Sequence, residues 1–397
     1  MQVVGIIQEQ HPDRARLFMQ WKRMGWPILV DSLNLLGTSL VPLTLFIDER
    51  GIIREVSPPL EDAQQRVRNF LRQDFGEDDH AVEDADPLKV DADALPEPDI
   101  EALRVAGAAG TAITLRNLAD GLLLWGDEGD LDESIAVYER ALRADASDGK
   151  THFRAGVAYR RRSESNQRQA ADFSAAVRHW ERALDIDPNN YIWRRRIQQY
   201  GPRLEKPYPF YDWVEVAREE IISRGEDPVM LRVEPRGAEI AQPLDEFRSA
   251  SEGDEPDPTG RILRDQGEFI DLEVTVVPAR IAPGTSARVH LVFRPRLAAQ
   301  AHWNNEVGDL AVWVTVPPHW DANAEYLTVA RPPEAVSQED RRVELELLAG
   351  ASAAPGPQTI SAYALYYVCE DVHGACLYRR QDMSIEVEVV PAQAVKQ

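Results

Sequence analysis

The sequence predicts a multidomain protein in which an α/β part is followed by an α-helical part and then by an antiparallel β part. Strand and helix patterns alternate near the N-terminus, a helical motif recurs in the middle, and hydrophobic residues alternate with polar ones from about residue 268. Two linkers containing acidic, proline-bearing stretches, 76–100 and 226–267, separate these patterns, because such stretches bury too little apolar surface to pack. An acidic interaction tail is the alternative reading of these stretches. The predicted domains are 1–75, 101–225 and 268–391.

Charge and hydropathy narrow the classes of partner. The 397 residues carry a formal net charge of −23. Nucleic acids and anionic lipid surfaces attract cationic proteins, so the sequence predicts neither as a partner. No apolar run approaches the roughly 18–20 residues that a membrane-spanning helix needs, and the given chain shows no secretory signal. Two cysteines do not by themselves reveal the redox compartment.

The N-terminal part alternates strand and helix patterns. "VVGII", "WPILVD", "LTLFID" and "IIREV" are predicted strands, and helices are expected over 11–25 and 61–72. Strands separated by helices of this length indicate βαβ units and a mainly parallel sheet. The stretch "GTSLVPLTLFIDERGIIREV" resembles the second half of the thioredoxin-like family, of the membrane-tethered disulfide reductase or peroxiredoxin-related type. The resemblance implies that Pro42 is the cis-proline beside that family's active site.

The family's cysteine motif has no counterpart in this part of the sequence. In the family it lies upstream of the strand matching "VVGII", and no cysteine occurs here before Cys369. We therefore expect no thiol chemistry from residues 1–75. We also expect the natural protein to begin upstream of Met1, with a signal peptide and a cysteine motif there. The missing strand of that family fold would lie between the strands matching "VVGII" and "LTLFID".

The middle part contains an internal repeat. "YERALRADAS" at 138–147 recurs as "WERALDIDPN" at 180–189, an offset of 42 residues. Both copies resemble the second helix of a tetratricopeptide repeat, whose period is about 34 residues. We expect 101–200 to be entirely helical, with the extra residues in "RRRSESNQRQA" looping out between the two helices of repeat two. Trp125, Tyr138, Tyr159 and Trp180 are predicted core residues, and a partner protein or peptide is expected on the concave side.

The C-terminal part has six strand candidates separated by turns rich in proline and glycine, which predicts an antiparallel, immunoglobulin-like β-sandwich. Its stretch "YYVCEDVHGACLYRR" holds both cysteines, Cys369 and Cys376, which must close a hairpin tip. The stretch resembles the "L-V-C-E-D-V-C-x-P" signature of the N-terminal periplasmic domain of the thiol–disulfide interchange protein DsbD family. The resemblance covers about 268–390 and implies a reversible disulfide that relays electrons. The inserted "HGA" and the missing proline at the end of the signature depart from the family.

Three interpretations of the cysteine pair remain open. As a structural disulfide it would restrict the denatured chain by about 2.5 kcal/mol for an eight-residue loop. As a metal site, Cys369, His373 and Cys376 would supply three ligands within one tight turn, which is unlike the two separated pairs of most zinc sites, so no metal is predicted. As an exchange pair, the cysteines would be gated by Tyr366, Tyr367 and Tyr378, and His373 would favour the Cys376 thiolate.

The sequence thus favours a thiol–disulfide redox protein that acts through Cys369 and Cys376 without a cofactor. Its partners would be thiol or disulfide proteins, or a membrane electron donor. Its location would be periplasmic if an upstream signal exists. The alternative is a non-catalytic interaction or scaffold protein with a structural hairpin disulfide. No phosphate loop or nucleophile elbow supports a hydrolase or transferase.

Overall fold

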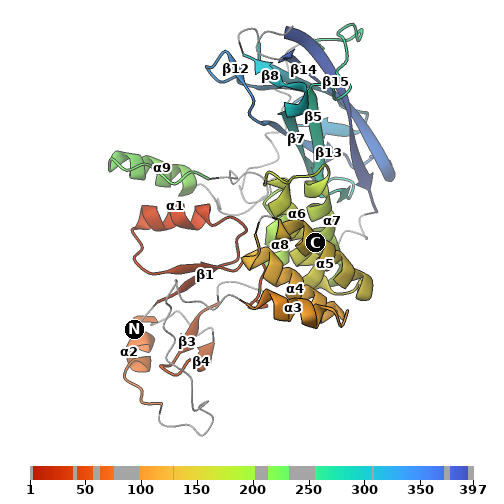
Figure 1. Ribbon diagram of the computed structural model, residues 1–397. Coiled ribbons are helices and arrows are strands. Elements are labelled where there is room, and N and C mark those ends of the chain that lie inside the picture. Colours follow the sequence, from red (N-terminus) through yellow and green to blue (C-terminus); the bar gives the residue numbers. More distant parts are fainter. Residues whose placement is uncertain are drawn as a thin grey trace.

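A computed structural model describes residues 3–38, 43–56, 63–75, 98–127, 129–201, 213–231, 255–305, 308–370 and 376–391. Figure 1 shows a row of helices at the centre, a body of antiparallel strands at one end and the N-terminal segment on the other side. The coarse prediction of a multidomain chain with helical and antiparallel β parts is confirmed. Within the described ranges, no helix is both long enough and apolar enough to cross a membrane.

The N-terminal strands form two small sheets. Strand β1 (Gly5–Ile7) pairs in parallel with β2 (Ile28–Val30), and β3 (Leu45–Ile47) pairs antiparallel with β4 (Ile53–Val56). Helix α1 (Asp13–Lys22) connects the first pair, and α2 (Ala63–Phe70) follows the second. The expected mainly parallel sheet is therefore limited to β1 and β2 in the described part of the chain.

The described residues from 98 to 201 form helices joined by short turns, with no strand among them, as the sequence predicts. Its elements are α3 (Ile100–Gly107), α4 (Ala112–Trp125), α5 (Asp130–Ala144), α6 (Gly149–Ser163), α7 (Asp172–Ile186) and α8 (Tyr191–Gln198). Helix α6 ends at Ser163 and α7 begins at Asp172, so the inserted residues lie between these two helices. Side chains of Thr111, Asp148 and Asn190 cap three of the helix starts by accepting backbone N–H bonds.

The predicted core residues of this helical array differ in burial. Tyr138 and Trp180 are fully buried and Tyr159 is partly buried. The prediction that Trp125 lies in the core is wrong, because it is the last residue of α4 and is 47% exposed. Gly156 explains how Trp180 fits, since a Cβ at this glycine would lie 2.4 Å from the indole Nε1.

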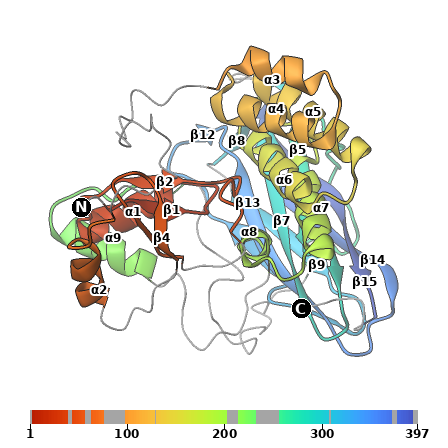
Figure 2. The same cartoon turned by 90° about the horizontal axis from the view of Figure 1, so that it is seen from below.

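The helical array binds the loops that follow β1 and β2. Arg196 on α8 donates from Nη2 to the carbonyl oxygens of Gln8 and Ser32, at 2.8 and 3.1 Å. Arg154 on α6 donates from Nε to the Leu33 carbonyl at 3.1 Å. Figures 1 and 2 show these two loops reaching from the small sheet toward α6 and α8. Part of the array's surface is therefore covered by the chain itself. Helix α9 (Trp213–Ser223) packs on the other side of this segment, against α1.

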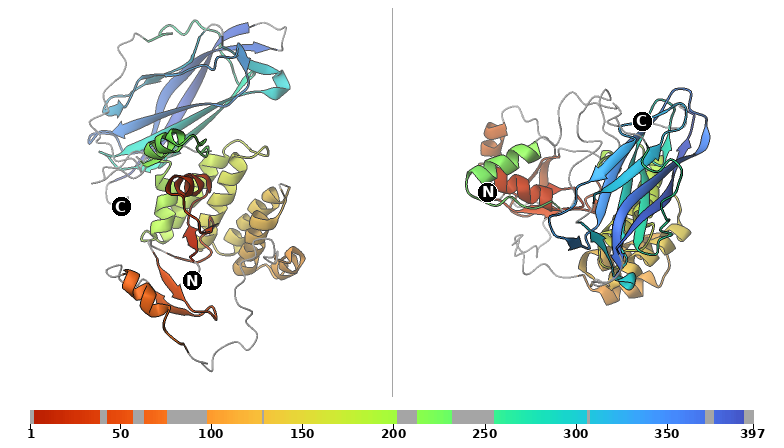
Figure 3. Two further views of the ribbon diagram at one scale, coloured as in Figure 1. Left: turned by 90° about the vertical axis from the view of Figure 1, so that its left-hand side faces the viewer. Right: turned by 90° about the horizontal axis from the view of Figure 1, so that it is seen from above.

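The C-terminal part consists of two facing sheets, visible in Figure 3. One has the order β10-β13-β7-β5 and the other β11-β9-β14-β15-β6, with β8 also paired to β14 and β12 to β8. The strands are β5 (Ile270–Val277), β6 (Arg280–Ile281), β7 (Ser286–Pro295), β8 (Ala301–Asn304), β9 (Leu310–Thr315), β10 (Trp320–Ala322), β11 (Tyr326–Val329), β12 (Val336–Ser337), β13 (Arg341–Ala349), β14 (Gly356–Glu370) and β15 (Cys376–Val389). All pairings are antiparallel except β15 with β6. Side chains from both sheets form one hydrophobic core.

Candidate functional site

The cysteines lie at the end of the hairpin formed by β14 and β15. Fourteen consecutive residue pairs run from Gly356 opposite Val389 to Cys369 opposite Cys376. Cys369 is disulfide-bonded, and Cys376 is the only other cysteine of the sequence. The expectation that the pair closes a hairpin tip is confirmed by this register. His373 and Pro42, both named from the sequence, lie outside the described residues, and so does the side chain of Cys376.

Cys369 is 2% exposed even though it lies near the hairpin end. Its strand is covered on both edges here, because Cys369 faces Cys376 on β15 and His302 on β8. A thiolate that opens a disulfide must approach one sulfur along the S–S axis. The burial of Cys369 means that attack on the Cys369 sulfur first requires the structure around it to open.

The three tyrosines named as a gate fall on two different faces of the sheet. Successive side chains of a strand point to opposite faces. Tyr367 therefore shares the outer face with Cys369, and its ring stacks on that of Tyr378 with centroids 4.4 Å apart. Tyr378 is 38% exposed. Tyr366 instead points into the sandwich and is fully buried, so the gating hypothesis remains for Tyr367 and Tyr378 only.

Tyr366 has a structural role beneath the hairpin. Its hydroxyl lies 2.9 Å from both Asp265 Oδ2 and Gln381 Oε1, and its ring packs edge-on against Trp303. Burial, followed by the charge of Asp265, raises the pKa of Tyr366 well above its usual value. The phenol therefore stays neutral and acts as a hydrogen-bond donor that links β14 to the loop before β5, where Asp265 lies.

His302 is a neighbour of the disulfide that sequence reasoning did not find. It lies directly opposite Cys369 on β8, and its Nδ1 is 3.4 Å from the Gln300 carbonyl oxygen. Residues directly opposite in an antiparallel pair point to the same face. His302 is therefore the histidine that the described structure places beside the cysteine. The only signal in the sequence was the short pattern "HWNNE", and the pairing of β8 with β14 cannot be derived from it.

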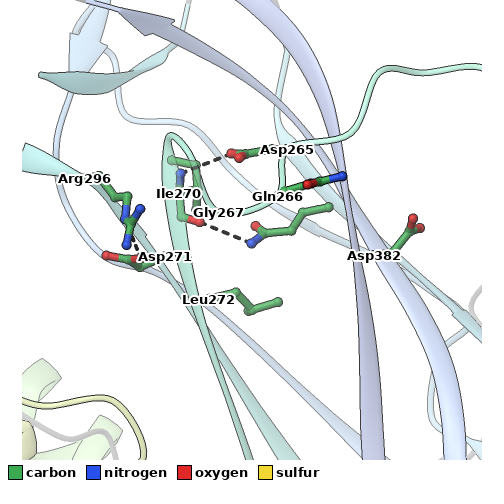
Figure 4. A pocket seen from close by; sticks show the side chains of 9 residues that line it. Asp265, Gln266, Gly267, Ile270, Asp271, Leu272, Arg296 and Asp382 are labelled. Atoms are coloured by element: carbon green, nitrogen blue, oxygen red, sulfur yellow. Dashed lines mark hydrogen bonds and ion pairs between the residues drawn. The ribbon is translucent and has the colours of Figure 1, made fainter. Parts of the chain in front are cut away.

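A polar recess of about 460 Å³ opens between the start of β5 and the strand β15. Figure 4 shows that Asp265, Asp271 and Arg296 line it. Asp265 accepts backbone N–H bonds from residues 268–270, and Asp271 forms an ion pair with Arg296 at 2.7 Å. Asp265 thus holds the loop before β5. Asp382 also lines the recess and is paired with Arg264 and Arg380, so each described carboxylate of the recess already has a partner. Across the described ranges no group of three or more histidine, cysteine or acidic side chains is placed to hold a metal ion.

No family model matches the chain, and no curated protein matches it either. Similar solved structures include AvmM, which catalyses macrocyclization in alchivemycin A biosynthesis, at 15% identity over 34% of this chain and 98% of that one, with a TM-score of 0.19. The bacterial hydrophobin BslA gives 13% identity over 31% and 97% of the two chains, with a TM-score of 0.16. The CooA pilin subunit of enterotoxigenic Escherichia coli gives 10% identity over 31% of this chain and 99% of that one, with a TM-score of 0.15. At these TM-scores the similarities identify neither fold nor function.

Proposed function

We propose that the protein performs thiol–disulfide exchange outside the cytoplasm, through a reversible bond between Cys369 and Cys376. The observation that carries the proposal is that the two cysteines of the chain face each other at the end of the longest hairpin, with Cys369 already in a disulfide. A disulfide at a strand end opens without breaking the ladder behind it. Because Cys369 is shielded, the partner thiolate would attack Cys376 and release the Cys369 thiolate.

The finer fold assignments belong to the same proposal. The pairs β1–β2 and β3–β4 fit two halves of a thioredoxin-like sheet. The helices α4 to α7 fit two tetratricopeptide-type repeats, and the two facing sheets fit an immunoglobulin-like sandwich of the DsbD N-terminal type. In this proposal the helical array holds the N-terminal segment and a protein partner, and the sandwich exchanges electrons with a thiol protein or a membrane electron donor.

The alternative is a non-catalytic scaffold with a structural disulfide. It is favoured by the 2% exposure of Cys369 and by the strands that pair with β14 on both sides. Such shielding is what a bond resistant to reduction would show.

Trapping distinguishes the two functions. The oxidised full-length protein is incubated with a thioredoxin that lacks its resolving cysteine, and the mixed disulfide is mapped by mass spectrometry. The exchange proposal expects rapid trapping at Cys376 rather than Cys369. Trapping only as fast as the chain unfolds, or at both cysteines equally, would support the scaffold.

A further inference from the structure

Two histidines face each other inside the helical array, far from the cysteines in the sequence. His152 on α6 and His179 on α7 approach with their Nδ1 atoms 3.1 Å apart. The side chain of His179 is 15% exposed, and His152 is also partly buried. A separation of 3.1 Å is a hydrogen-bond distance, so the chemistry of the two nitrogens depends on where their protons are.

The opposite nitrogen of each ring is committed as a donor. His152 Nε2 lies 3.2 Å from the carbonyl oxygen of Ala146, and a carbonyl oxygen can only accept. His179 Nε2 lies 3.1 Å from Oε1 of Glu139, which also accepts a hydrogen bond from the Tyr159 hydroxyl at 3.0 Å. The hydrogen bond with His179 lowers the pKa of Glu139, so this carboxylate is ionised at neutral pH and can only accept. Both Nε2 atoms therefore carry hydrogen.

Counting protons then determines the state of the facing pair. If both rings were neutral, two lone pairs would face each other at 3.1 Å. If both were imidazolium, two N–H groups would point at each other. One proton between the Nδ1 atoms is the arrangement that makes a hydrogen bond. We propose that His152 and His179 share a single proton, and that this proton makes the pair a pH-sensitive clamp joining α5, α6 and α7.

The charged groups around the pair favour His179 as the charged ring. Glu139 on α5 contacts His179, while Arg182 on α7 acts on His152. Burial lowers the pKa of His152, and the charges of His179 and Arg182 add to this effect. The hydrogen bond to the Ala146 carbonyl and the charge of Glu139 oppose it only in part. Two further cations lie nearby, Arg143 on α5 beside Glu139 and Arg162 on α6 over the Tyr159 ring. The proton is thus held on His179 between a carboxylate and the neutral His152.

The clamp is strongest over an intermediate pH range. The shared proton makes the hydrogen bond between the two rings, so this contact is lost as the pH rises and the proton leaves. A second proton would place two N–H groups opposite each other. The free energy of unfolding therefore also decreases as the pH falls below about 6.5, where the histidines of the unfolded chain titrate. The two steps belong to the pair rather than to either ring. Acidification is therefore expected to loosen the packing of α6 against α7.

Nuclear magnetic resonance of the full-length protein labelled with ¹⁵N-histidine tests the proton count directly, since the sequence contains eight histidines. We expect one ring with both nitrogens protonated and one neutral ring protonated at Nε2, coupled to each other at neutral pH. His152→Gln and His179→Gln assign the two signals. Independent titration of the two rings, a neutral Nδ1–H tautomer in either ring, or a stoichiometric metal ion between them would overturn the proposal.

Hydrogen exchange tests the clamp. After correction for intrinsic exchange rates, the equilibrium constant for local opening of α6 and α7 should be smallest at intermediate pH. On the acid side it should rise by up to about tenfold per pH unit, because opening is linked to the uptake of one proton. Glutamine at either position can donate or accept, so both variants should lose this pH dependence. His319→Asn is the control, because this exposed residue has a φ of 69° that asparagine tolerates. Equal pH dependence in His179→Gln and the control would refute the clamp.

Discussion

Substituting Gly156 with alanine tests how the central helices pack. A Cβ at this position would lie 2.4 Å from Nε1 and 2.5 Å from Cδ1 of Trp180, closer than any ordinary contact. The indole cannot move freely, because it is fully buried, donates to the Phe153 carbonyl oxygen at 3.2 Å and stacks on Tyr200. The methyl group and the five-membered ring cannot both occupy the space between α6 and α7.

The magnitude follows from three contributions. Overpacking a core costs about 1–3 kcal/mol, and displacing the indole N–H from its acceptor costs about 1–3 kcal/mol. Alanine returns about 1 kcal/mol because it is a better helix former than glycine. The centre of these ranges is a net loss of about 3 kcal/mol.

Hydrogen exchange of α6 and α7 in the full-length protein measures this loss, with β14 and β15 as the internal reference. Trp180→Phe supplies the matched background, since phenylalanine lacks the five-membered ring that the new methyl group would meet. In that background Gly156→Ala should be nearly neutral or stabilising. If Gly156→Ala stabilises the wild-type protein as much as it does the Trp180→Phe variant, the packing argument is wrong.

Three further predictions concern other contacts. Arg196→Met removes the charged hydrogen bonds to the loop carbonyls, including that of Gln8, and each contributes about 1.5–3 kcal/mol. Proteolysis of residues 3–38 should therefore accelerate, while the β-sandwich stays protected. An unchanged rate of cleavage would contradict this. Burial raises the pKa of Glu344, but the hydrogen bonds and charges of His290 and Arg288 together outweigh this effect and lower it to about 2. Because the folded pKa is depressed below 4.5, stability is lost as the pH falls from that value toward about 2, and Glu344→Gln should lose this dependence in acid unfolding. If reduction of the disulfide requires the stacked rings of Tyr367 and Tyr378 to separate, Tyr378→Ala should speed its reduction by thioredoxin. An aromatic pair contributes about 0.5–1.5 kcal/mol, so we expect an increase of about 2–10-fold. An unchanged rate would show that the two tyrosines do not gate the disulfide.

The helical array could be predicted because its signals are local. The repeated motif and capping residues such as Asp148 act within a few turns of helix. The burial of Trp125 could not be predicted, because the residue ends α4 and the sequence does not show which side chains cover a helix end. The hairpin register of Cys369 and Cys376 could be predicted because six residues separate them.

Long-range pairings and the choice of face could not be predicted. Tyr366 and Tyr367 are adjacent residues of the same type. Because side chains alternate along a strand, the two must point to opposite faces of the sheet, but the sequence does not show which of them is buried. The placement of β8 beside β14, which brings His302 to Cys369, joins segments more than sixty residues apart in sequence. The arginines that hold the N-terminal loops looked like solvated charges, because nothing local indicates that they donate to backbone carbonyls elsewhere in the chain.

The proposed function requires that a partner protein can reduce the disulfide bond at Cys369. Equilibrating the full-length protein in glutathione buffers of known potential, with alkylation of free thiols and mass spectrometry, measures its reduction potential. We expect a value above the roughly −300 mV typical of structural disulfides. A potential below about −300 mV, together with a large loss of stability in Cys376→Ser, would contradict it and identify the pair as a structural disulfide.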